Sequence, residues 1–591
     1  MLTLYDANGG VIMPGFMLEI SIKGARKNFG ICRRNDLLVQ RIEDKKSKYY
    51  IERRTVKKFL NDKVFYESPD FIVLTEGVIL NRKELERLYG KSNFAETVIA
   101  MYQQKGEDFF KEFRGPFSGL LYDKVNDKWI IYTNHYGDKQ IFYYIGDDAF
   151  LFGSEVTYLT SYLKNNGIAY SFNREAGYML LTYGYMLEDN TLIKEIRKLP
   201  AGHYVVIDKS GFRMKTYFEI DNEPDYTLKE DEIIEELDSL FRKAVRLEFD
   251  KDKEYGYTHL ASLSGGLDSR MTVWVAHEEG YDDILIYTFS QSDYLDEKIA
   301  KKIAADLSYE FLFKSLDNGV CLMIDDMVRR QVEINFGNCL YSGNAHVRSF
   351  ADIVNLNPFG LVHTGQLGDV IVGTYSSKPY HEKNFELLAG AYSFVLKDRL
   401  SIKLNRIYKN EEEFKMLNRG FNGMLQGNLA FQQYTEVVSP FLDVDFFEFC
   451  MKLPVEFRFG HRIYFKWILK KHPKAANYKW EKIRSKITTP QLSIFGRKVP
   501  ITQIIPKITR KVLYKNSLSS KHSSMNPLEY WYRKNPKLRE YFERKFHEGK
   551  IILTGEKELL RDIERMYSEG GVIEKTQVLT LLEAYKYYFL E

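Results

Sequence analysis

One short segment limits the folds open to this chain more than any other. Residues 264–270 read Ser-Gly-Gly-Leu-Asp-Ser-Arg, between a strand-like apolar run and a helix-like run. Glycines without a Cβ let backbone N–H groups approach an anion closely, and a helix start adds partial positive charge. The segment therefore predicts a phosphate-binding loop, with Ser264 and Ser269 as further donors. Asp268 would be repelled by phosphate, so its presence indicates a bridging Mg²⁺. An ordinary Ser-Gly-Gly turn is the alternative.

The length and charge of the chain narrow the class of protein. With 591 residues, the chain is too long for one hydrophobic core, so we expect two large domains. A net charge of +4 is small for this size and argues against nucleic-acid binding. The four cysteines, Cys32, Cys321, Cys339 and Cys450, have no metal-ligand or disulfide spacing. Because a signal peptide and a transmembrane segment are also lacking, we expect a cytoplasmic protein.

The segment around the loop resembles a known enzyme family. Ser264 to Ser269 matches the SGGxDS loop of the N-type ATP pyrophosphatases, and the chain resembles the asparagine synthetase family from about Asp70 to about Pro490. The resemblance implies an α/β and α+β architecture. An N-terminal, Ntn-like αββα sandwich of the class II glutamine amidotransferase type would precede a doubly wound parallel sheet of the ATP-pyrophosphatase type, with a helical C-terminal elaboration. The expected boundaries are 1–210 for the first domain, 211–231 for a linker, 232–495 for the ATP-binding domain and 496–591 for a basic and helical extension.

Hydrophobic periodicity supports both halves of this architecture. The predicted strands are 70–74, 77–80, 119–123, 129–132, 259–263 and 284–290, and the predicted helices are 96–104, 232–249 and 296–307. In the second half, strands alternate with helices, which is typical of a parallel sheet with ligands at the carboxyl ends of its strands.

The first domain lacks what the family needs to hydrolyse glutamine. Family members have a cysteine directly after the initiator methionine as the nucleophile, but residue 2 here is Leu2. Glu76-Gly77 corresponds to the family's Asn-Gly oxyanion pair, so an anion stands where negative charge must be stabilised. Cys32 is too close in sequence to this pair to replace the nucleophile. We predict a scaffold without glutaminase activity, and an amidase with another nucleophile is the alternative.

The resemblance also implies a nucleotide site made by two segments. Residues 364–373 resemble the family's Ser-Gly-Glu-Gly-Ser-Asp-Glu-Val-Phe-Gly-Gly element. Asp268 and Asp369, each on a glycine-rich strand end, are suited to share one Mg²⁺ ion. The implied ATP-binding residues are Leu263, Ser264, Gly265, Gly266, Asp268, Ser269, Phe289, Thr364 and Gly365. An exposed loop aspartate is the alternative for Asp369.

Three further residues are implied in catalysis. Lys486 resembles the family lysine that stabilises charge on the α-phosphate and on the later tetrahedral intermediate, with a solvated surface lysine as the alternative. Glu436 would orient or deprotonate an amine, or would be a buried structural carboxylate, because Val438 replaces the arginine that usually follows it. Gln366 replaces the family's glutamate and cannot act as a general base, which argues against plain asparagine synthesis.

A basic segment follows the predicted catalytic residues. Residues 482–527 include ten Lys or Arg and no acidic residue. We expect this segment to fold over the phosphates or to bind an acidic substrate or partner, and a solvated face or a membrane surface contact are the alternatives. The sequence leaves a homodimer open.

The predicted reaction is amide formation with ATP and Mg²⁺ as cofactors. A carboxylate of a small molecule or a peptide would attack the α-phosphate, release pyrophosphate and form an acyl-adenylate, which an amine or ammonia would then attack. Without a glutaminase, the nitrogen would be free ammonia or an amine of the substrate itself, as the resemblance to β-lactam synthetases and lasso-peptide cyclases implies. A catalytically silent binding or regulatory homologue is the alternative of another class.

Overall fold

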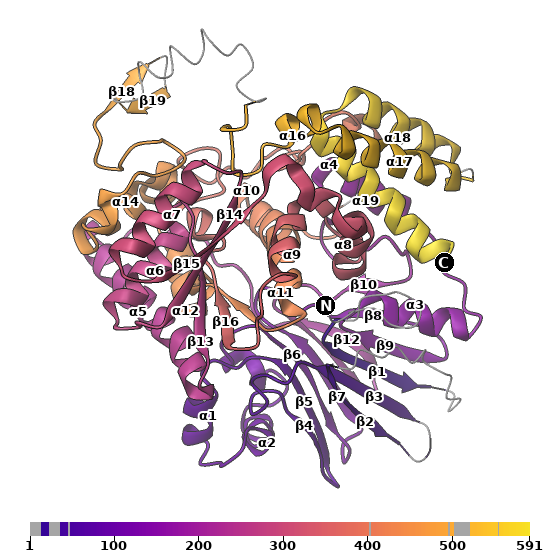
Figure 1. Ribbon diagram of the computed structural model, residues 1–591. Helices are drawn as coiled ribbons and strands as arrows, with labels where there is room; N and C mark the ends of the chain where they lie inside the picture. Colours follow the sequence, from indigo (N-terminus) through magenta and orange to yellow (C-terminus); the bar gives the residue numbers. More distant parts are fainter. Residues whose placement is uncertain are drawn as a thin grey trace.

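The computed structural model describes residues 13–22, 36–44, 46, 48–400, 404–494, 497–500, 520–553 and 555–591. Leu2, Cys32 and much of the basic segment lie outside the described residues. The described chain forms two six-stranded antiparallel sheets, a five-stranded parallel sheet, a two-stranded antiparallel pair of β18 (Gln491–Ile494) and β19 (Arg497–Pro500), and many helices (Figure 1).

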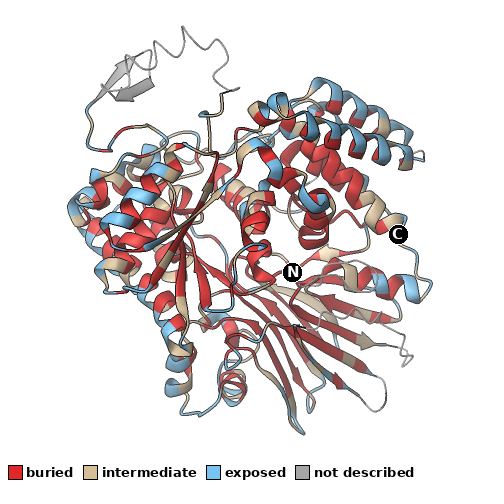
Figure 2. Cartoon of the chain, viewed as in Figure 1, coloured by how far each residue is buried: buried red, intermediate tan, exposed pale blue. Residues whose placement is uncertain are grey.

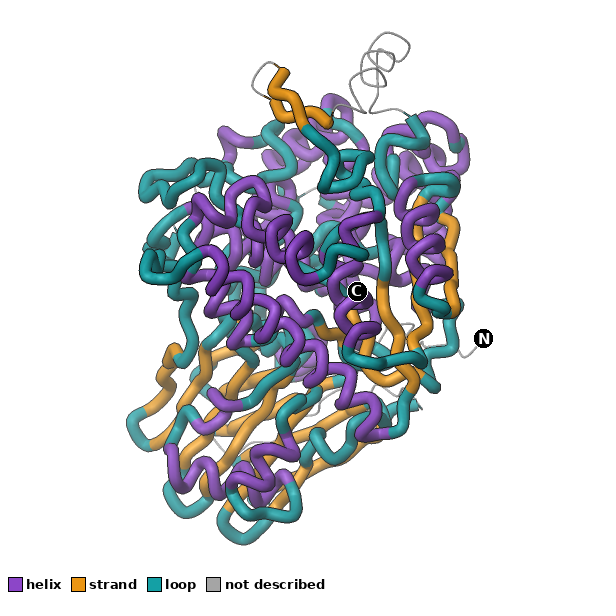
Figure 3. Tube along the Cα trace, turned by 90° about the vertical axis from the view of Figure 1, so that its left-hand side faces the viewer, coloured by secondary structure: helices purple, strands orange, loops and turns teal. Residues whose placement is uncertain are grey.

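The first domain is a sandwich of two antiparallel sheets. One sheet has the order β10-β8-β9-β1-β3-β2, with β1 Gly15–Ser21, β2 Leu38–Glu43, β3 Tyr49–Thr55, β8 Phe142–Ile145, β9 Ala149–Gly153 and β10 Arg197–Lys198. The other has the order β12-β11-β7-β6-β5-β4, with β4 Phe65–Glu67, β5 Phe71–Gly77, β6 Phe117–Asp123, β7 Lys128–Thr133, β11 His203–Asp208 and β12 Gly211–Thr216. Figure 3 shows both layers of strands below the helices of the second half.

Alternating side chains place helices outside both sheets. Ile72 and Leu74 of β5 pack against the facing sheet, whereas Val73 between them packs outward with Val98 of a helix. Helices α1 (Arg82–Leu88) and α2 (Phe94–Lys105) cover this outer face, and α3 (Val156–Asn165) covers the other sheet. The predicted αββα sandwich is therefore confirmed. The strand predicted at 77–80 is not present, because β5 ends at Gly77.

The second half contains a parallel sheet with the order β15-β14-β13-β16-β17. Its strands are β13 Thr258–Ser262, β14 Ile284–Ser290, β15 Glu310–Ser315, β16 Phe359–His363 and β17 Val437–Val438. Helices α5 (Glu230–Tyr255), α6 (Asp268–Glu278) and α7 (Leu295–Asp306) cover one face, and α9 (Ala345–Ala351) and α11 (Leu429–Gln432) cover the other. Helices on both faces of a parallel sheet confirm the predicted doubly wound arrangement.

The C-terminal helices share a core with a helix of the first domain. The helices α16 (Leu528–Lys534), α17 (Pro536–Ile552), α18 (Lys557–Glu569) and α19 (Val572–Phe589) pack with α4 (Arg174–Tyr183) and α8 (Met327–Asn335). Their outer faces are exposed, while the sheets are largely buried (Figure 2). No described helix combines the length and apolar character that crossing a membrane requires.

The expected linker at 211–231 differs from the structure at its start. Gly211–Thr216 forms β12, which pairs with β11 from Asp208 to His203. Its side chains are mostly polar and half-buried, so the sequence resembles a linker although the backbone completes a sheet edge. The connecting segment is therefore limited to the residues between β12 and α5.

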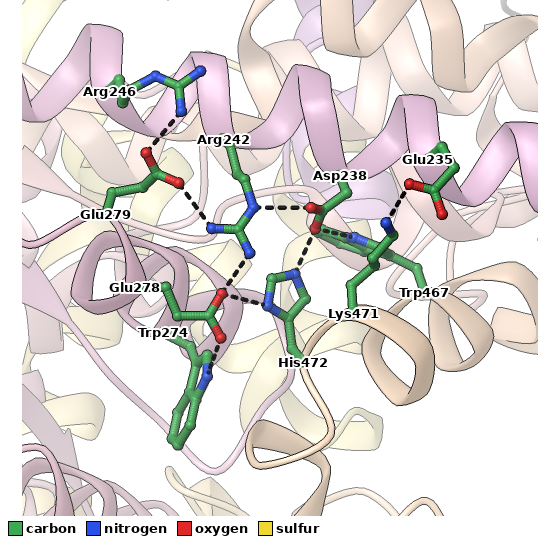
Figure 4. A network of polar contacts seen from close by, with 10 residues as sticks. All are labelled: Glu235, Asp238, Arg242, Arg246, Trp274, Glu278, Glu279, Trp467, Lys471 and His472. Carbon is green, nitrogen blue, oxygen red and sulfur yellow. Dashed lines mark hydrogen bonds and ion pairs between the residues drawn. The ribbon is translucent and has the colours of Figure 1, made fainter.

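A polar network fixes α6 against α5 and against α14 (Arg462–Lys471) (Figure 4). Arg242 of α5 donates to Glu278 and Glu279 at the end of α6 and to Asp238 on its own helix. His472, which follows α14, lies 2.7 Å from Asp238 Oδ1 and 3.0 Å from Glu278 Oε2. Because α6 begins at Asp268, these contacts hold the helix whose start carries the predicted phosphate loop.

Candidate active site

Two loops meet at the carboxyl ends of adjacent parallel strands, one after β13 and one after β16. Their backbones are in contact. A Cβ built on Gly365 would lie 2.3 Å from the Ser269 backbone nitrogen, and a Cβ on Gly368 would lie 2.8 Å from Asp268 Cγ. Since only glycine permits so close an approach, these two positions bring the predicted nucleotide-binding segments together.

The carboxylates of Asp268 and Asp369 lie at this contact, and both are partly buried. Burial and then the charge of Asp369 raise the pKa of Asp268, whose Oδ1 accepts a hydrogen bond from the Tyr464 hydroxyl at 2.8 Å. Burial also raises the pKa of Asp369, although the positive charges of Lys482 and Arg419 oppose this shift. Two carboxylates that destabilise each other's charge would be relieved by a divalent cation, so these oxygen donors fit Mg²⁺.

The donors of the phosphate loop contact groups within the protein. The Ser264 N–H donates to Ser269 Oγ at 3.0 Å, and the Gly266 N–H donates to Ser264 Oγ at 3.1 Å. The Gly265 N–H donates to Asp296 Oδ1 at 2.7 Å, and burial raises the pKa of Asp296 to about 7. Sequence reasoning missed Asp296, although an acidic residue in the first turn of the helix after the second strand was a usable signal.

Lys486, the predicted catalytic lysine, and the nearby Lys482 have different surroundings. The Lys486 side chain is exposed, and no described hydrogen bond or ion pair connects it to the two aspartates. The charge of Lys482, four residues earlier, lowers the pKa of both Asp268 and Asp369. Its Nζ lies 3.4 Å from His461 Nε2 and 5.4 Å from the centre of a tryptophan ring. Lys482 therefore supplies positive charge at the aspartate pair; sequence reasoning named it only as the first residue of the basic segment expected to fold over the phosphates.

Thr364 and Gln366 are held by the strand next to their loop. The Thr364 hydroxyl donates to the Val438 carbonyl at 2.9 Å, and the Ser439 hydroxyl donates to the Gln366 carbonyl at 3.0 Å. The side-chain oxygen of Gln366 is buried and has no hydrogen-bond partner among the described residues. Its side-chain nitrogen would lie 3.6 Å from a Cβ built on Gly427.

Leu263 and Phe289, which were also predicted to bind the nucleotide, differ in exposure. Leu263 is buried in the core, and its N–H donates to the Tyr287 carbonyl at 3.0 Å. Phe289 is half-buried at the end of β14, with its ring centre 4.8 Å from that of His346. Phe289 thus lies at the strand edge where a planar ligand group could contact it, whereas Leu263 offers only backbone groups.

Glu436 lies in a buried charge cluster that joins the two domains. Its carboxylate is 3.1 Å from Lys139 Nζ and 3.3 Å from Lys63 Nζ, and Lys63 Nζ is also 3.7 Å from Glu76. Burial would raise the pKa of Glu436, but the charges of Lys139 and Lys63 outweigh burial and lower it. Two lysines of the first domain therefore neutralise a carboxylate whose usual arginine is replaced by Val438.

A second titratable group lies below the β16 loop. Among the described residues, Asp252, His259 and His363 are the one set of three or more metal-capable side chains with ligand atoms within 4.8 Å of one another. Asp252 Oδ2 lies 2.9 Å from His259 Nδ1 and 2.8 Å from His363 Nε2, and Glu248 lies 3.5 Å from His363 Nδ1. Because these atoms already contact one another, we interpret the group as a structural network that holds β16.

Comparisons with known proteins find similarity to amidotransferase domains and to asparagine synthetases. A family model described as a glutamine amidotransferase domain matches residues 63–218. The putative glutamine-hydrolysing asparagine synthetase 2 of Methanocaldococcus jannaschii is 28% identical over 242 residues, which cover 39% of this chain and 45% of that protein. Asparagine synthetase 1 of Bacillus subtilis is 27% identical over 259 residues, which cover 42% of this chain and 39% of that protein. The chain thus spans less than half the length of these relatives.

The solved structures add little to this comparison. Glutamine phosphoribosylpyrophosphate amidotransferase from B. subtilis, in complex with ADP and GMP, is 11% identical, covers 53% of this chain and 88% of its own, and has a TM-score of 0.23. The family model and these relatives show that the chain is similar to glutamine amidotransferase domains over residues 63–218 and to asparagine synthetases over 39% to 42% of its length.

Proposed function

We propose that this protein is an ATP-dependent, AMP-forming ligase that joins a carboxylate to an amine or to ammonia. The observation that carries the proposal is the pair Asp268 and Asp369, held together where two glycine loops touch at the start of α6. Helix starts favour phosphate, and the paired carboxylates favour a divalent cation. The names of the asparagine synthetase relatives support amide formation as the reaction class.

The reaction has two displacements. A substrate carboxylate oxygen attacks the α-phosphorus of ATP, the bond to pyrophosphate breaks, and an acyl-adenylate forms. A nitrogen nucleophile then attacks the acyl carbon, the bond to AMP breaks, and the nitrogen loses a proton. Mg²⁺ held by Asp268 and Asp369 would neutralise charge on the triphosphate. Lys482 and Lys486 are the candidate cations for the charge that develops on the α-phosphate.

We further propose that the first domain does not hydrolyse glutamine, although the names of the relatives include this activity. Glu76 is buried beside Lys63, so its carboxylate stands where a glutaminase needs neutral donors. The nitrogen would then be free ammonia or an amine within the substrate, as in intramolecular amide formation. Release of glutamate from glutamine by the purified protein would contradict this part of the proposal.

Replacing either aspartate tests the central proposal. Asp268→Asn and Asp369→Asn should abolish carboxylate-dependent release of pyrophosphate from ATP, because each removes one charged ligand of the cation. Tyr464→Phe should have a milder effect, since it removes only the hydrogen bond to Asp268. Without Mg²⁺, both Asn variants should unfold at a temperature equal to or above that of the native chain, because the repulsion between the carboxylates is gone.

The same experiment separates the proposal from its alternative. A silent binding or regulatory homologue would release no pyrophosphate with any carboxylate and would show no difference between the native chain and the Asn variants. Normal pyrophosphate release in both Asn variants would instead contradict the cation assignment.

A further inference from the structure

Arg419 is an arginine without an acidic partner close to the aspartate pair. It lies on the π-helical segment η7 (Met416–Gly423), and no carboxylate among the described residues is within ion-pair distance of its guanidinium. Its Nε is buried and has no hydrogen-bond partner in the described part of the chain. Although the guanidinium also interacts with the Tyr392 hydroxyl, its Nε–H is unused, and a half-buried planar guanidinium without an anion suits a carboxylate ligand.

The surroundings of Arg419 connect it to the acyl side of the proposed reaction. A Cβ built on the next residue, Gly420, would lie 3.7 Å from Leu367 Cδ1, and Leu367 directly follows Gln366. The charge of Arg419 also acts on the Asp369 carboxylate, whose pKa it lowers. The segment η7 therefore lies beside the β16 loop, within electrostatic reach of the site where the α-phosphate is expected.

An aromatic ring lies over the guanidinium of Arg419. The guanidinium carbon lies 5.4 Å from the centre of the Tyr392 ring, and the buried Tyr185 has its ring centre 6.3 Å from that of Tyr392. The Tyr375 hydroxyl lies 3.4 Å from the sulfur of Met424, which is 45% exposed. Rings and a thioether next to a cation exclude water from an ion pair and contact apolar substituents of a ligand.

A second polar atom in this region also has no partner. The Gln366 side-chain oxygen is a buried acceptor without a hydrogen bond among the described residues. Buried polar atoms are rarely left unpaired, so an unpaired acceptor and an unpaired donor next to one loop indicate a ligand with complementary groups. An acid that also carries an N–H group would meet both requirements.

We propose that Arg419 binds the carboxylate of the acid substrate, while Tyr375, Tyr392 and Met424 contact an aromatic or aliphatic group beside it and Gln366 accepts a hydrogen bond from its N–H. This inference rests on the proposed function, because it names the substrate class of the same site. The ligand is an N-substituted or amino-bearing carboxylic acid with an apolar side chain, and Arg419 selects it by charge.

Direct binding measurements test this assignment without requiring turnover. The probes are acetate, L-aspartate, N-acetyl-L-leucine and N-acetyl-L-phenylalanine, titrated by calorimetry into the full chain with Mg²⁺ and α,β-methylene-ATP. The N-acetyl acids should bind more tightly than acetate. Arg419→Met should weaken binding of the tightest acid about 10- to 100-fold, the usual range for lost hydrogen bonds to a charged group, while Arg419→Lys should weaken it less.

Two controls make the result specific. Arg41→Met removes an exposed arginine on β2 of the first domain that pairs with Glu52 at 2.6 Å, and should leave acid binding unchanged. The affinity for α,β-methylene-ATP should change less than threefold in Arg419→Met, an estimate for a residue that does not contact the nucleotide.

Three outcomes would overturn the assignment. They are equal acid binding by the native chain and Arg419→Met, no binding of any of the four acids, and a loss of nucleotide affinity as large as the loss of acid affinity. Failure of the proposed function has a different signature: an acid would bind in an Arg419-dependent manner, yet the native chain would release no pyrophosphate from ATP in its presence.

Discussion

Gly365 and Gly368 are required because of the atoms that lie next to them. Their backbone conformation does not require glycine, since neither has a positive φ. Each lies against the backbone or carboxylate of the preceding phosphate loop so closely that a methyl group would overlap it. The distance between the two aspartates therefore depends on the absence of two side chains. A steric requirement of this kind is specific to each position and can be tested one residue at a time.

Gly365→Ala should reduce pyrophosphate release about 100-fold or more, because displacement of reacting groups by about 1 Å has effects of this size. Its Cβ would lie 2.3 Å from Ser269 N and 2.4 Å from Asp268 C, so the two loops must separate. Gly343→Ala is the matched control, since the nearest atom to its Cβ is Leu340 Cγ at 3.8 Å. A native rate in Gly365→Ala would show that contact between the loops is not needed.

Replacing Lys482 and replacing Lys486 should affect the pH dependence of adenylation differently. Lys482 lowers the pKa of both aspartates, so Lys482→Met should raise the pKa of each. The acidic limb of the pH profile for pyrophosphate release should then move to higher pH, because ionised aspartates are needed to hold the cation. Lys486→Met should lower the rate without moving this limb. A shift in Lys486→Met and none in Lys482→Met would reverse the assignment of the two lysines.

At the scale of elements, α5 supports the site from below. This helix of 26 residues contacts α6 through Arg242, and it contacts the strand before the second loop through Glu248 and Asp252. Asp252 also accepts a hydrogen bond from the Leu361 N–H at 2.7 Å. One helix thus contacts both strands that precede the predicted nucleotide-binding loops, β13 through His259 and β16 through His363, which explains why its inner face is polar at these positions.

His363 should make stability depend on pH between about 7 and 9. Burial would lower its pKa, but the charges and hydrogen bonds of Asp252 and Glu248 outweigh burial and raise it to about 9. A raised pKa stabilises the fold below the ordinary value of about 6.5, and this contribution is lost as pH rises through about 9. The neighbouring Glu248 has a pKa raised to about 7, so its own effect occurs mostly below this window.

Urea unfolding of the native chain and of His363→Asn measures this effect. The free energy of unfolding of the native chain should fall between pH 7 and pH 10 by up to about 3 kcal/mol more than that of the variant. His259 faces the same Asp252 carboxylate and remains present in both proteins. Parallel pH curves for the two proteins would show that His363 does not titrate in this range.

Elements whose cause is local were predictable from the sequence, and those that depend on distant partners were not. The strand, glycine turn and helix around 264–270 follow from neighbouring residues, and their predicted arrangement agrees with β13 and α6. β12 was missed because its half-polar sequence becomes a strand only by pairing with β11. The partner of Glu436, Lys139, is 297 residues away, and no local pattern could have indicated it.

At the scale of the whole molecule, buried charges cross the boundary between the two domains. Lys63 and Lys139 of the sandwich pair with Glu436, which directly precedes β17. β17 in turn carries the carbonyl that accepts a hydrogen bond from Thr364. The sandwich therefore contacts the strand that supports the second loop.

A double-mutant cycle of Lys139→Met and Glu436→Gln tests this connection. Each single change leaves a buried charge without one partner and should lower the free energy of unfolding by about 3 to 5 kcal/mol. The double variant should lose less than the sum, with a coupling energy of about 1 to 3 kcal/mol, since the two changes remove one interaction. Lys198→Met is the matched control, because Lys198 is a buried lysine whose Nζ donates to Asn422 Oδ1 at 2.9 Å instead of pairing with Glu436. It should be additive with Glu436→Gln.

If the cluster positions the loop, Lys139→Met should also slow pyrophosphate release in protein that is still fully folded, and the conservative Lys139→Arg should restore part of the rate. Additive losses for Lys139 and Glu436, with an unchanged rate in Lys139→Met, would limit the sandwich to a passive neighbour of the ATP-binding half.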